Sequence, residues 1–428
     1  MKPRAAVETD NLRNPSRVTP WKIAKINWLP KSLATRLFGA PIAPNHQEWS
    51  NIRKALFQGD KAMDQLVDWF FVVGARHGKA LFDQALTCGV DSIENPPEQL
   101  KAFFDTVESP PDWLDQDLLT EGVKLSSLPG AVSFYVLRDL ALMGGYTYFS
   151  TMNQSLARAG SLKKDPSLRL GETGKWYFDV IKPGGLHRYG DGYITTMNVR
   201  LVHALVRRNL QSKADWQQDL WGIPINQVDM LATYLAFGPV NLSGGRLFGV
   251  FPSKKESAAI MHMWRYVGWL MGVDEQFLAA TEGDGLRKLY HTFLTHNCPD
   301  DKVHALGSAL KNEPLNRAGT DQRHSFVFIE KLMRRYAYHK HMSNSALILG
   351  PLRKRKLGIP FWILPWYPVI SALPRFLYIQ GTRLMGEQAF NKLLERNRAK
   401  AIQVLNNYFN GREQRIISPA KSHPAHIQ

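Results

Sequence analysis

The first clue to the fold is the stretch Val199-Arg200-Leu201-Val202-His203-Ala204-Leu205-Val206-Arg207-Arg208, whose apolar residues recur at the three- and four-residue steps of an α-helix. On this repeat Val199 and Val206 lie to one side of His203, and Arg200 and Arg207 lie to the other. A neutral imidazole can ligate iron, an apolar wall suits a porphyrin face, and guanidinium groups suit the propionates. The layout therefore suits haem, although a lone His on an amphipathic helix is more often a hydrogen-bonded core residue.

The same helical repeat extends over most of the chain. Residues 48–87 carry apolar residues at helical steps, and the turn sequences Asn95-Pro96-Pro97 and Ser109-Pro110-Pro111 predict a short helix between them. Residues 131–159 predict a long buried helix that breaks near Gly144-Gly145. Few segments alternate with period two, and no repeat of 20 to 50 residues is present. We therefore expect an all-α protein with a single large helical domain.

The domain boundaries follow from changes in composition. Residues 1–47 are polar or interrupted by proline and predict an N-terminal extension that wraps the domain. The helical pattern occupies residues 48–410, and residues 411–428 form a C-terminal tail. The basic N-terminus lacks an apolar segment of the kind found in secretory signals, which predicts a cytoplasmic protein.

Composition excludes several classes of protein. The two cysteines, Cys88 and Cys298, are too few for a disulfide framework or a Cys-rich metal site. The net charge of +17 is compatible with nucleic acid, but the basic residues are scattered and no nucleic-acid-binding motif is present, so we expect no nucleic-acid partner. Attraction to an anionic membrane surface explains the charge equally well.

One segment stands out from the rest by its apolar character. Residues 357–373 are nearly uncharged, contain Trp362 and Trp366, and lie between the basic cluster Arg353-Lys354-Arg355-Lys356 and Arg375. The prolines in this segment argue against a regular membrane-spanning helix. Two interpretations remain for residues 353–375: peripheral contact with a membrane interface, or an ordinary buried loop.

Several motifs recur in the order of one known family. An Arg-x-x-x-Thr element at Arg169 and Thr173 precedes an aromatic patch and the Val-Arg-x-x-His helix of His203. Two further stretches follow, Trp221-Gly222-Ile223-Pro224 and Met263-Trp264-Arg265-Tyr266. From about residue 144 to 350 the chain resembles the haem-dependent oxygenase family of latex-clearing protein (rubber oxygenase) and the ER-bound oxygenase MpaB.

This resemblance implies a helical core related to the globin bundle and a non-covalently held haem b. It implies that His203 is the proximal ligand of the haem iron, and that Arg169 and Thr173 lie on the oxygen side. Arg200 and Arg207 are candidates for binding the propionates. The sequence departs from the rubber-cleaving pattern where those proteins have a Lys before the Thr and a Glu in the preceding helix: the matching residues here are Glu172 and Asn153.

The three residues on the oxygen side also have ordinary structural interpretations. Arg169 is able to pair with a surface carboxylate, Thr173 to cap a helix that starts near Gly174, and Glu172 to be an acidic residue in the first turn of that helix. Alternatively, Glu172 acts as a base near bound oxygen.

Other polar residues have simpler explanations. Arg265, on the apolar stretch that also carries His262, is expected to pair with Asp229 or Glu256. His291, His296 and Cys298 match no standard zinc spacing. The run His339-Lys340-His341 is expected on a basic, solvated face.

Two hypotheses for function remain. The first is a haem b-dependent oxygenase that uses dioxygen on a hydrophobic substrate, isoprenoid or lipid-like, in which His203, Arg169, Thr173 and Glu172 form the site. The second is a non-catalytic basic helical protein that binds a membrane surface or an acidic partner, in which His203 is a core residue.

Overall fold

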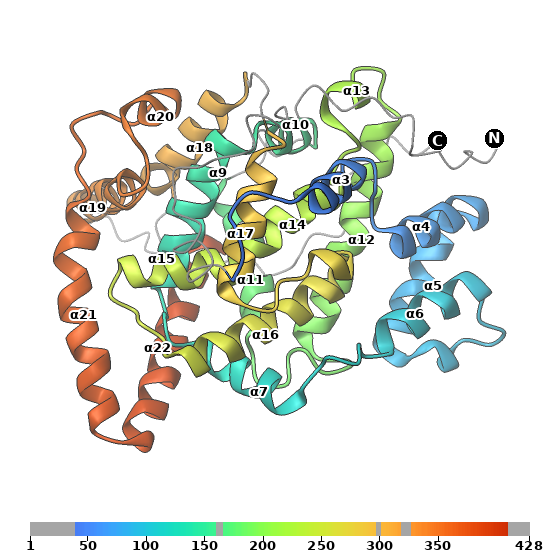
Figure 1. Cartoon of the computed structure of the whole chain (residues 1–428), viewed down its shortest axis with the longest axis horizontal. Coiled ribbons are helices and arrows are strands. Elements are labelled where there is room, and N and C mark those ends of the chain that lie inside the picture. Colours follow the sequence, from blue (N-terminus) through green and yellow to red (C-terminus); the bar gives the residue numbers. More distant parts are fainter. Residues whose placement is uncertain (1–38, 160–165, 297–300, 318–326, 410–428) are drawn as a thin grey trace.

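Helices and turns account for the whole computed structural model over the residues it describes, 39–159, 166–296, 301–317 and 327–409, where no strand occurs (Figure 1). The all-α prediction is therefore confirmed. The predicted extension 1–47 and tail 411–428 lie largely or wholly outside the described residues.

The α-helices of the first half are α3 (His46–Ala55), α4 (Lys61–Val73), α5 (Ala75–Cys88), α6 (Glu98–Glu108), α7 (Gln116–Leu125), α8 (Val132–Phe134), α9 (Met143–Tyr148), α10 (Ser150–Arg158), α11 (Pro166–Val180) and α12 (Asp191–Gln211). The second half contains α13 (Gln218–Trp221), α14 (Gln227–Leu235), α15 (Asn241–Leu247), α16 (Lys254–Leu270), α17 (Glu282–Phe293), α18 (Val303–Asn316), α19 (Val327–Ala346), α20 (Pro351–Lys356), α21 (Trp366–Leu384) and α22 (Glu387–Phe409). Two π-helices, η3 (Tyr135–Leu142) and η4 (Ala236–Val240), and two short 3₁₀ turns, Val90–Ser92 and Glu275–Phe277, complete the described elements.

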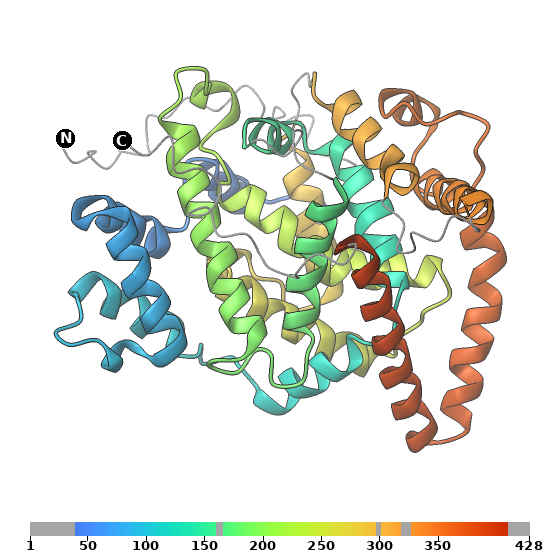
Figure 2. The ribbon, with the colours of Figure 1, turned by 180° about the vertical axis from the view of Figure 1, so that it is seen from behind.

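The helices fall into three groups in space. Helices α4, α5 and α6 lie at one end of the molecule, α11, α12, α14, α16 and α17 form the centre, and α19 to α22 lie at the other end (Figures 1 and 2). Helix α12 contacts α4 on one side and α11 on the other, so it connects the first group to the centre.

The centre is held together by aromatic packing. Trp264 of α16 is buried and stacks on Tyr177 of α11, with ring centroids 5.8 Å apart, and on Phe237 of η4 at 5.3 Å. Large aromatic side chains contribute much of the hydrophobic stabilisation of such a core. This cluster places α11 firmly against α16 and η4.

The predicted helix boundaries differ from the observed ones at particular residues. The short helix predicted between the two proline turns is confirmed as α6. The helical pattern of residues 48–87 forms three helices, because Asp60 caps a new helix and Gly74 takes a positive φ of 97° between α4 and α5. The predicted break near Gly144-Gly145 is wrong: α9 continues through these glycines, and the chain bends at Phe149, where ψ is 63°.

The apolar segment 357–373 forms part of a helix. Helix α21 begins at Trp366 and continues through Pro374, so prolines do not keep the whole segment out of helical structure. No helix in the described part of the chain has the length and apolar character needed to cross a bilayer. The buried-loop interpretation fits Leu357, Ile359 and Ile363, which are buried, but not Phe361, Trp362, Leu364 and Leu373, which are exposed.

Candidate functional site

The connection between α11 and α12 brings the two halves of the sequence motif together. This loop packs so tightly that a side chain at Gly185 would meet the carbonyl oxygen of Asp179 at 2.1 Å, and one at Gly192 would meet it at 2.6 Å. Glycine is therefore needed for the loop to return α12 alongside α11. The result is that Arg169 and His203, far apart in the sequence, lie on neighbouring helices.

Helix α12 is anchored to α4 and its N-cap by two ion pairs, one buried and one partly buried. Arg200 pairs with Asp60, through Nη2 and Oδ1 at 2.8 Å, and also donates to the carbonyl oxygen of Leu270 at 3.1 Å. Arg207 pairs with Asp64 and donates through Nη2 to the carbonyl oxygen of Ile225 at 3.0 Å. Since the two arginines are seven residues apart, they hold one face of α12 against α4 and set the direction of His203.

These ion pairs concern the prediction that Arg200 and Arg207 bind the propionates of a haem. Both guanidinium groups are buried and paired with carboxylates of α4, in an arrangement that is complete without a cofactor. A role of Arg200 and Arg207 in binding propionates stays a prediction, whereas their role in positioning α12 is visible in the structure.

His203 is a partly buried titratable residue whose Nδ1 atom makes no hydrogen bond to the described residues. Its Nδ1 atom is inaccessible to solvent and has no partner among the described residues, although the residue as a whole keeps some accessible surface. Burial, reinforced by the charges of Arg207 and Arg169, lowers the pKa of His203 to about 4. The ring is therefore neutral at physiological pH, which is the form that ligates metals.

Arg169 lies close enough to two buried rings to affect their ionisation. Its charge contributes to the lowered pKa of His203, and it acts against the burial that raises the pKa of Tyr146 to about 12. Tyr146 keeps partial exposure, like His203, in spite of this strong desolvation. Sequence reasoning missed Tyr146, because a Tyr in a Gly-rich, Ala-rich helix gives no signal of its own.

The remaining predicted residues lie around this pair of helices. Glu172 is largely buried and its carboxylate is 3.7 Å from Arg169, so Arg169 does pair with a carboxylate. Asn153 of α10 donates to the carbonyl oxygen of Tyr146 at 2.8 Å. Thr173 is exposed, and its hydroxyl donates to the carbonyl oxygen of Arg169 at 3.2 Å.

The structure thus groups Arg169, Glu172 and His203, with Tyr146 and Asn153 at the edge of the group. No contact between Thr173 and His203 is seen among the described residues. Two structural alternatives are corrected: α11 begins at Pro166, so Thr173 is not a helix cap and Glu172 is not in a first turn.

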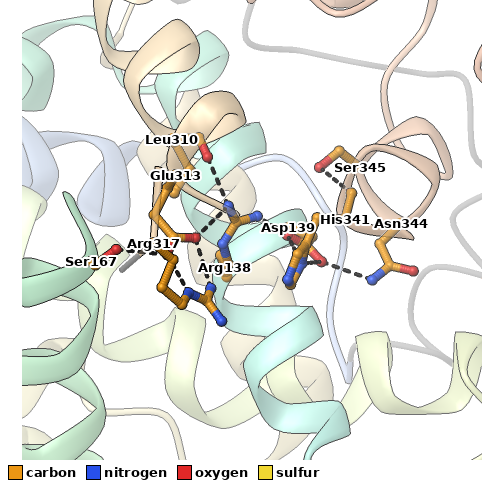
Figure 3. Close-up of polar contacts among 9 residues, drawn as sticks. All are labelled: Arg138, Asp139, Ser167, Leu310, Glu313, Arg317, His341, Asn344 and Ser345. Carbon is orange, nitrogen blue, oxygen red and sulfur yellow. Dashed lines mark hydrogen bonds and ion pairs between the residues drawn. The ribbon is translucent and has the colours of Figure 1, made fainter. Parts of the chain in front are cut away.

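A second cluster of buried charges lies between η3, α18 and α19, where Ser167 of α11 also donates to Glu313 at 2.8 Å (Figure 3). Arg138 and Asp139 are adjacent on η3, with Nη1 and Oδ1 at 2.6 Å, and Arg138 also lies 3.1 Å from Glu313. Nδ1 of His341 is 2.8 Å from Oδ2 of Asp139, and Asn344 donates to the same oxygen at 2.8 Å. We call Arg138, Asp139, Glu313, His341 and Asn344 the Asp139 network.

Neighbouring charges shift the pKa values of the titratable groups in this network. Burial alone would raise the pKa of Asp139, but His341 and Arg138 hold that pKa below its usual range. Burial, followed by the Arg138 charge, lowers the pKa of His341, and Asp139 acts in the opposite direction. Arg138 and Arg317 outweigh the burial of Glu313 and lower its pKa to about 2.

The prediction of a solvated His339-Lys340-His341 face is wrong for His341. Its side chain is buried, as are Ser343, Asn344 and Ser345, and only His339 of the run is exposed. The inner face of α19 is polar in sequence, so it looked like a surface. A polar face of this kind is buried stably only when each group finds a partner, as Asp139 provides here.

Other predicted contacts are different in the structure. The guanidinium of Arg265 lies over the ring of Trp113 at 3.8 Å, and Glu256 pairs with Arg383. His291 bonds to the carbonyl oxygen of Ile42 at 3.0 Å, and His296 bonds to Thr151 at 2.8 Å. The part of the chain that the structure describes contains no cluster of three or more His, Cys, Asp or Glu suited to a metal ion. Cys298 lies outside it.

Comparison with known proteins identifies the family. The family model described as ER-bound oxygenase mpaB/B'/Rubber oxygenase, catalytic domain, matches residues 134–375, which is more than half of the chain. The chain therefore belongs to this family. The matched region contains Arg169, Glu172, Thr173 and His203, and also the Asp139 network.

Two individual proteins are also similar to this chain. Rubber oxygenase from Streptomyces sp. (strain K30) is 26% identical over 205 residues, which is 46% of this chain and 47% of that protein. The match thus spans about half the length of this curated relative. A solved structure of latex clearing protein LCP in the closed state has 18% sequence identity and a TM-score of 0.49, covering 80% of this chain and 91% of that one.

Proposed function

We propose that the protein is a haem b-dependent oxygenase in which His203 is the proximal ligand of the haem iron. The observation that carries the proposal is the neutral, partly accessible imidazole of His203, whose buried Nδ1 has no partner within the described residues. A buried polar atom normally has a hydrogen-bond partner, so an exception calls for a ligand or another explanation. The resemblance to haem-dependent oxygenases, together with membership of the rubber oxygenase family, supports haem as the group that this residue would hold.

The residues near His203 fit such a cofactor. The low pKa of His203 means that no proton has to be lost before the ring binds iron. The two ion pairs to α4 fix the rotation of α12, so the imidazole is preorganised. When bound, the haem would supply the activation of dioxygen, a reaction that protein side chains do not carry out alone.

The protein's own residues have separate tasks in this proposal. Arg169 supplies a fixed positive charge near His203, where it favours anionic character in a bound group and keeps the imidazole neutral. Glu172 limits the movement of Arg169 through their ion pair. Thr173 offers a hydroxyl one helical turn from Arg169. We assign Arg200 and Arg207 to holding α12 in place.

The substrate we propose is a hydrophobic molecule with a carbon–carbon double bond, isoprenoid or lipid-like. The support is the similarity to the rubber oxygenase of Streptomyces sp. (strain K30), whose name gives a polyisoprenoid as its substrate. Because Glu172 stands where the rubber-cleaving pattern has a Lys, we do not assign a lysine-gated closed state to this protein. Dioxygen is the second substrate.

The test is oxygen consumption by haemin-reconstituted protein in the presence of a set of polyisoprenoid and unsaturated-lipid substrates. We expect consumption that depends on substrate, that His203→Ala abolishes, and that Arg169→Gln lowers by about tenfold or more, the usual range for loss of one preorganised charge. Reconstituted protein that consumes no oxygen with any of these substrates contradicts the oxygenase assignment.

A further inference from the structure

Helix α21 and the loop before it expose an unusual number of large apolar side chains. Phe361, Trp362 and Leu364 of the loop are 77%, 66% and 68% exposed. On α21 the exposed apolar residues are Val369, Ile370, Leu373, Leu377 and Leu384. We call these eight residues the α21 face. Contiguous exposed apolar surface on this scale marks an interaction site in soluble proteins.

The α21 face follows the helical repeat. Val369, Leu373 and Leu377 recur every four residues, which places them on one side of the helix. Ile379 and Thr382 are buried instead, on the side that packs against the rest of the molecule. Helix α21 lies at an edge of the molecule in both ribbon views, beside α22 (Figures 1 and 2).

A second exposed stripe adjoins the first. Helix α19 contacts α21 and exposes Phe328, Leu332 and Met333. The ring of Tyr336 on α19 lies 6.2 Å from that of Trp366 at the start of α21, so the two stripes meet there.

All the Asp, Glu, Lys and Arg positions in this part of the chain are basic. No Asp or Glu occurs between Glu330 and Glu387, whereas ten Lys and Arg residues do. Five of these basic side chains are exposed: Lys331, Arg335, Arg353, Arg355 and Lys356. Such a patch attracts a surface of high negative charge density, and apolar side chains alone would not require it.

We propose that the α21 face docks on the surface of an anionic lipid bilayer. Exposed Trp and Phe next to Lys and Arg match the composition of a membrane interface, where rings sit at headgroup depth and basic groups contact lipid phosphates. A second copy of the chain is a poorer match, because two such faces would bring like charges together. The attachment that we propose is peripheral, through these exposed side chains.

The experiment is sedimentation of the full chain with vesicles of phosphatidylcholine, with and without phosphatidylserine. The protein should pellet with the anionic vesicles and bind about tenfold or more weakly to neutral ones. Raising the salt from ~0.1 M to ~1 M shortens the screening length from about 10 Å to about 3 Å and should release most of the protein. The assay needs no haem, so its outcome is independent of the proposed oxygenase function.

Matched variants separate the two components of binding. Trp362→Ser with Leu373→Ser removes apolar anchors, and Arg355→Gln with Lys356→Gln removes charge; each pair should weaken binding by about tenfold or more. The control is Val72→Ser with Arg76→Gln at the other end of the molecule, where Val72 is 83% exposed and Arg76 is exposed too. It should bind as the unaltered protein does.

Three results would overturn the proposal. The first is pelleting that does not depend on anionic lipid, and the second is equal binding by the α21 variants and the control. The third is self-association without lipid, measured by sedimentation velocity at rising concentration and removed by Trp362→Ser with Leu373→Ser. That last result would assign the α21 face to a second copy of the chain.

Discussion

The surroundings of His203 and the Asp139 network are two places where this fold encloses titratable groups, and they differ in the number of hydrogen bonds that the central side chain makes. In the network, Asp139 receives bonds from Arg138, His341 and Asn344. Near His203, the Nδ1 atom has no partner within the described residues. The three bonds to Asp139 indicate a stabilising network, although Nε of Arg138 and Oδ1 of Asn344 have no partner within the described residues. The unpartnered Nδ1 of His203 is instead compatible with a site for a ligand.

The largest effect is expected from breaking the network at its centre. Asp139→Ala leaves the buried Arg138 without one of its two carboxylate partners and removes the acceptor of His341. Loss of one partner from a buried ion pair typically lowers the free energy of unfolding by about 3–5 kcal/mol. Urea denaturation measures it. The exposed pair Lys182–Asp191 provides the control, since Lys182→Ala should cost at most about 1 kcal/mol. Equal costs for the two variants would mean that the network does not stabilise the fold.

The next effect concerns the pH dependence of the haem-free protein. Because the pKa of His203 is about 4 in the folded state and 6.5 in the reference state, the unfolded chain binds more protons between these values. His203 therefore makes the free energy of unfolding fall as pH drops from 6.5 to 4, by up to about 3 kcal/mol. Replacement by Gln should make this fall shallower.

The comparison of His203→Gln with the unaltered protein is needed because His291, whose pKa is also lowered to about 4 by burial, contributes over the same range. Denaturation curves recorded at several pH values in both proteins isolate the share of His203. Parallel pH profiles would contradict the burial of a neutral imidazole at this position.

A smaller effect is expected from trimming the network at its edge. Asn344→Ala removes one hydrogen bond to the charged Asp139 while Arg138 and His341 remain. The free energy of unfolding should fall by about 1.5–3 kcal/mol, the range for a bond to a charged group. A cost as large as that of Asp139→Ala would show that the network fails as a unit when any member is lost.

The smallest effect is a change in ionisation alone. Arg169→Gln removes a positive charge that lowers the pKa of His203, so this pKa should rise. Titration of the His203 imidazole by NMR in the haem-free protein measures the change. The control is Arg76→Gln, at an exposed position of α5. An unchanged pKa of His203 would show that Arg169 does not act on this imidazole.

The features that could be predicted from the sequence are those that depend on residues close together in the chain. The helical class and α6 follow from spacing and proline turns within a few residues. The placement of Arg169 and His203 on neighbouring helices needed the family resemblance, because it depends on a loop of closely packed glycines.

The Asp139 network was out of reach because its members come from η3, α18 and α19. Each residue looks like a surface residue in its own segment, and only the tertiary contacts among them make burial favourable. The roles of Arg200 and Arg207 were missed for a similar reason, since their partners Asp60 and Asp64 lie some 140 residues earlier in the chain.

The most direct measurement is titration of the purified protein with haemin, followed by its absorption spectrum. The account predicts a saturable Soret band that His203→Ala loses and that added imidazole restores to this variant. Lys182→Ala should take up haemin as the unaltered protein does. A protein that binds no haemin, or that gives the same spectrum with and without His203, would contradict the assignment of His203 as the iron ligand.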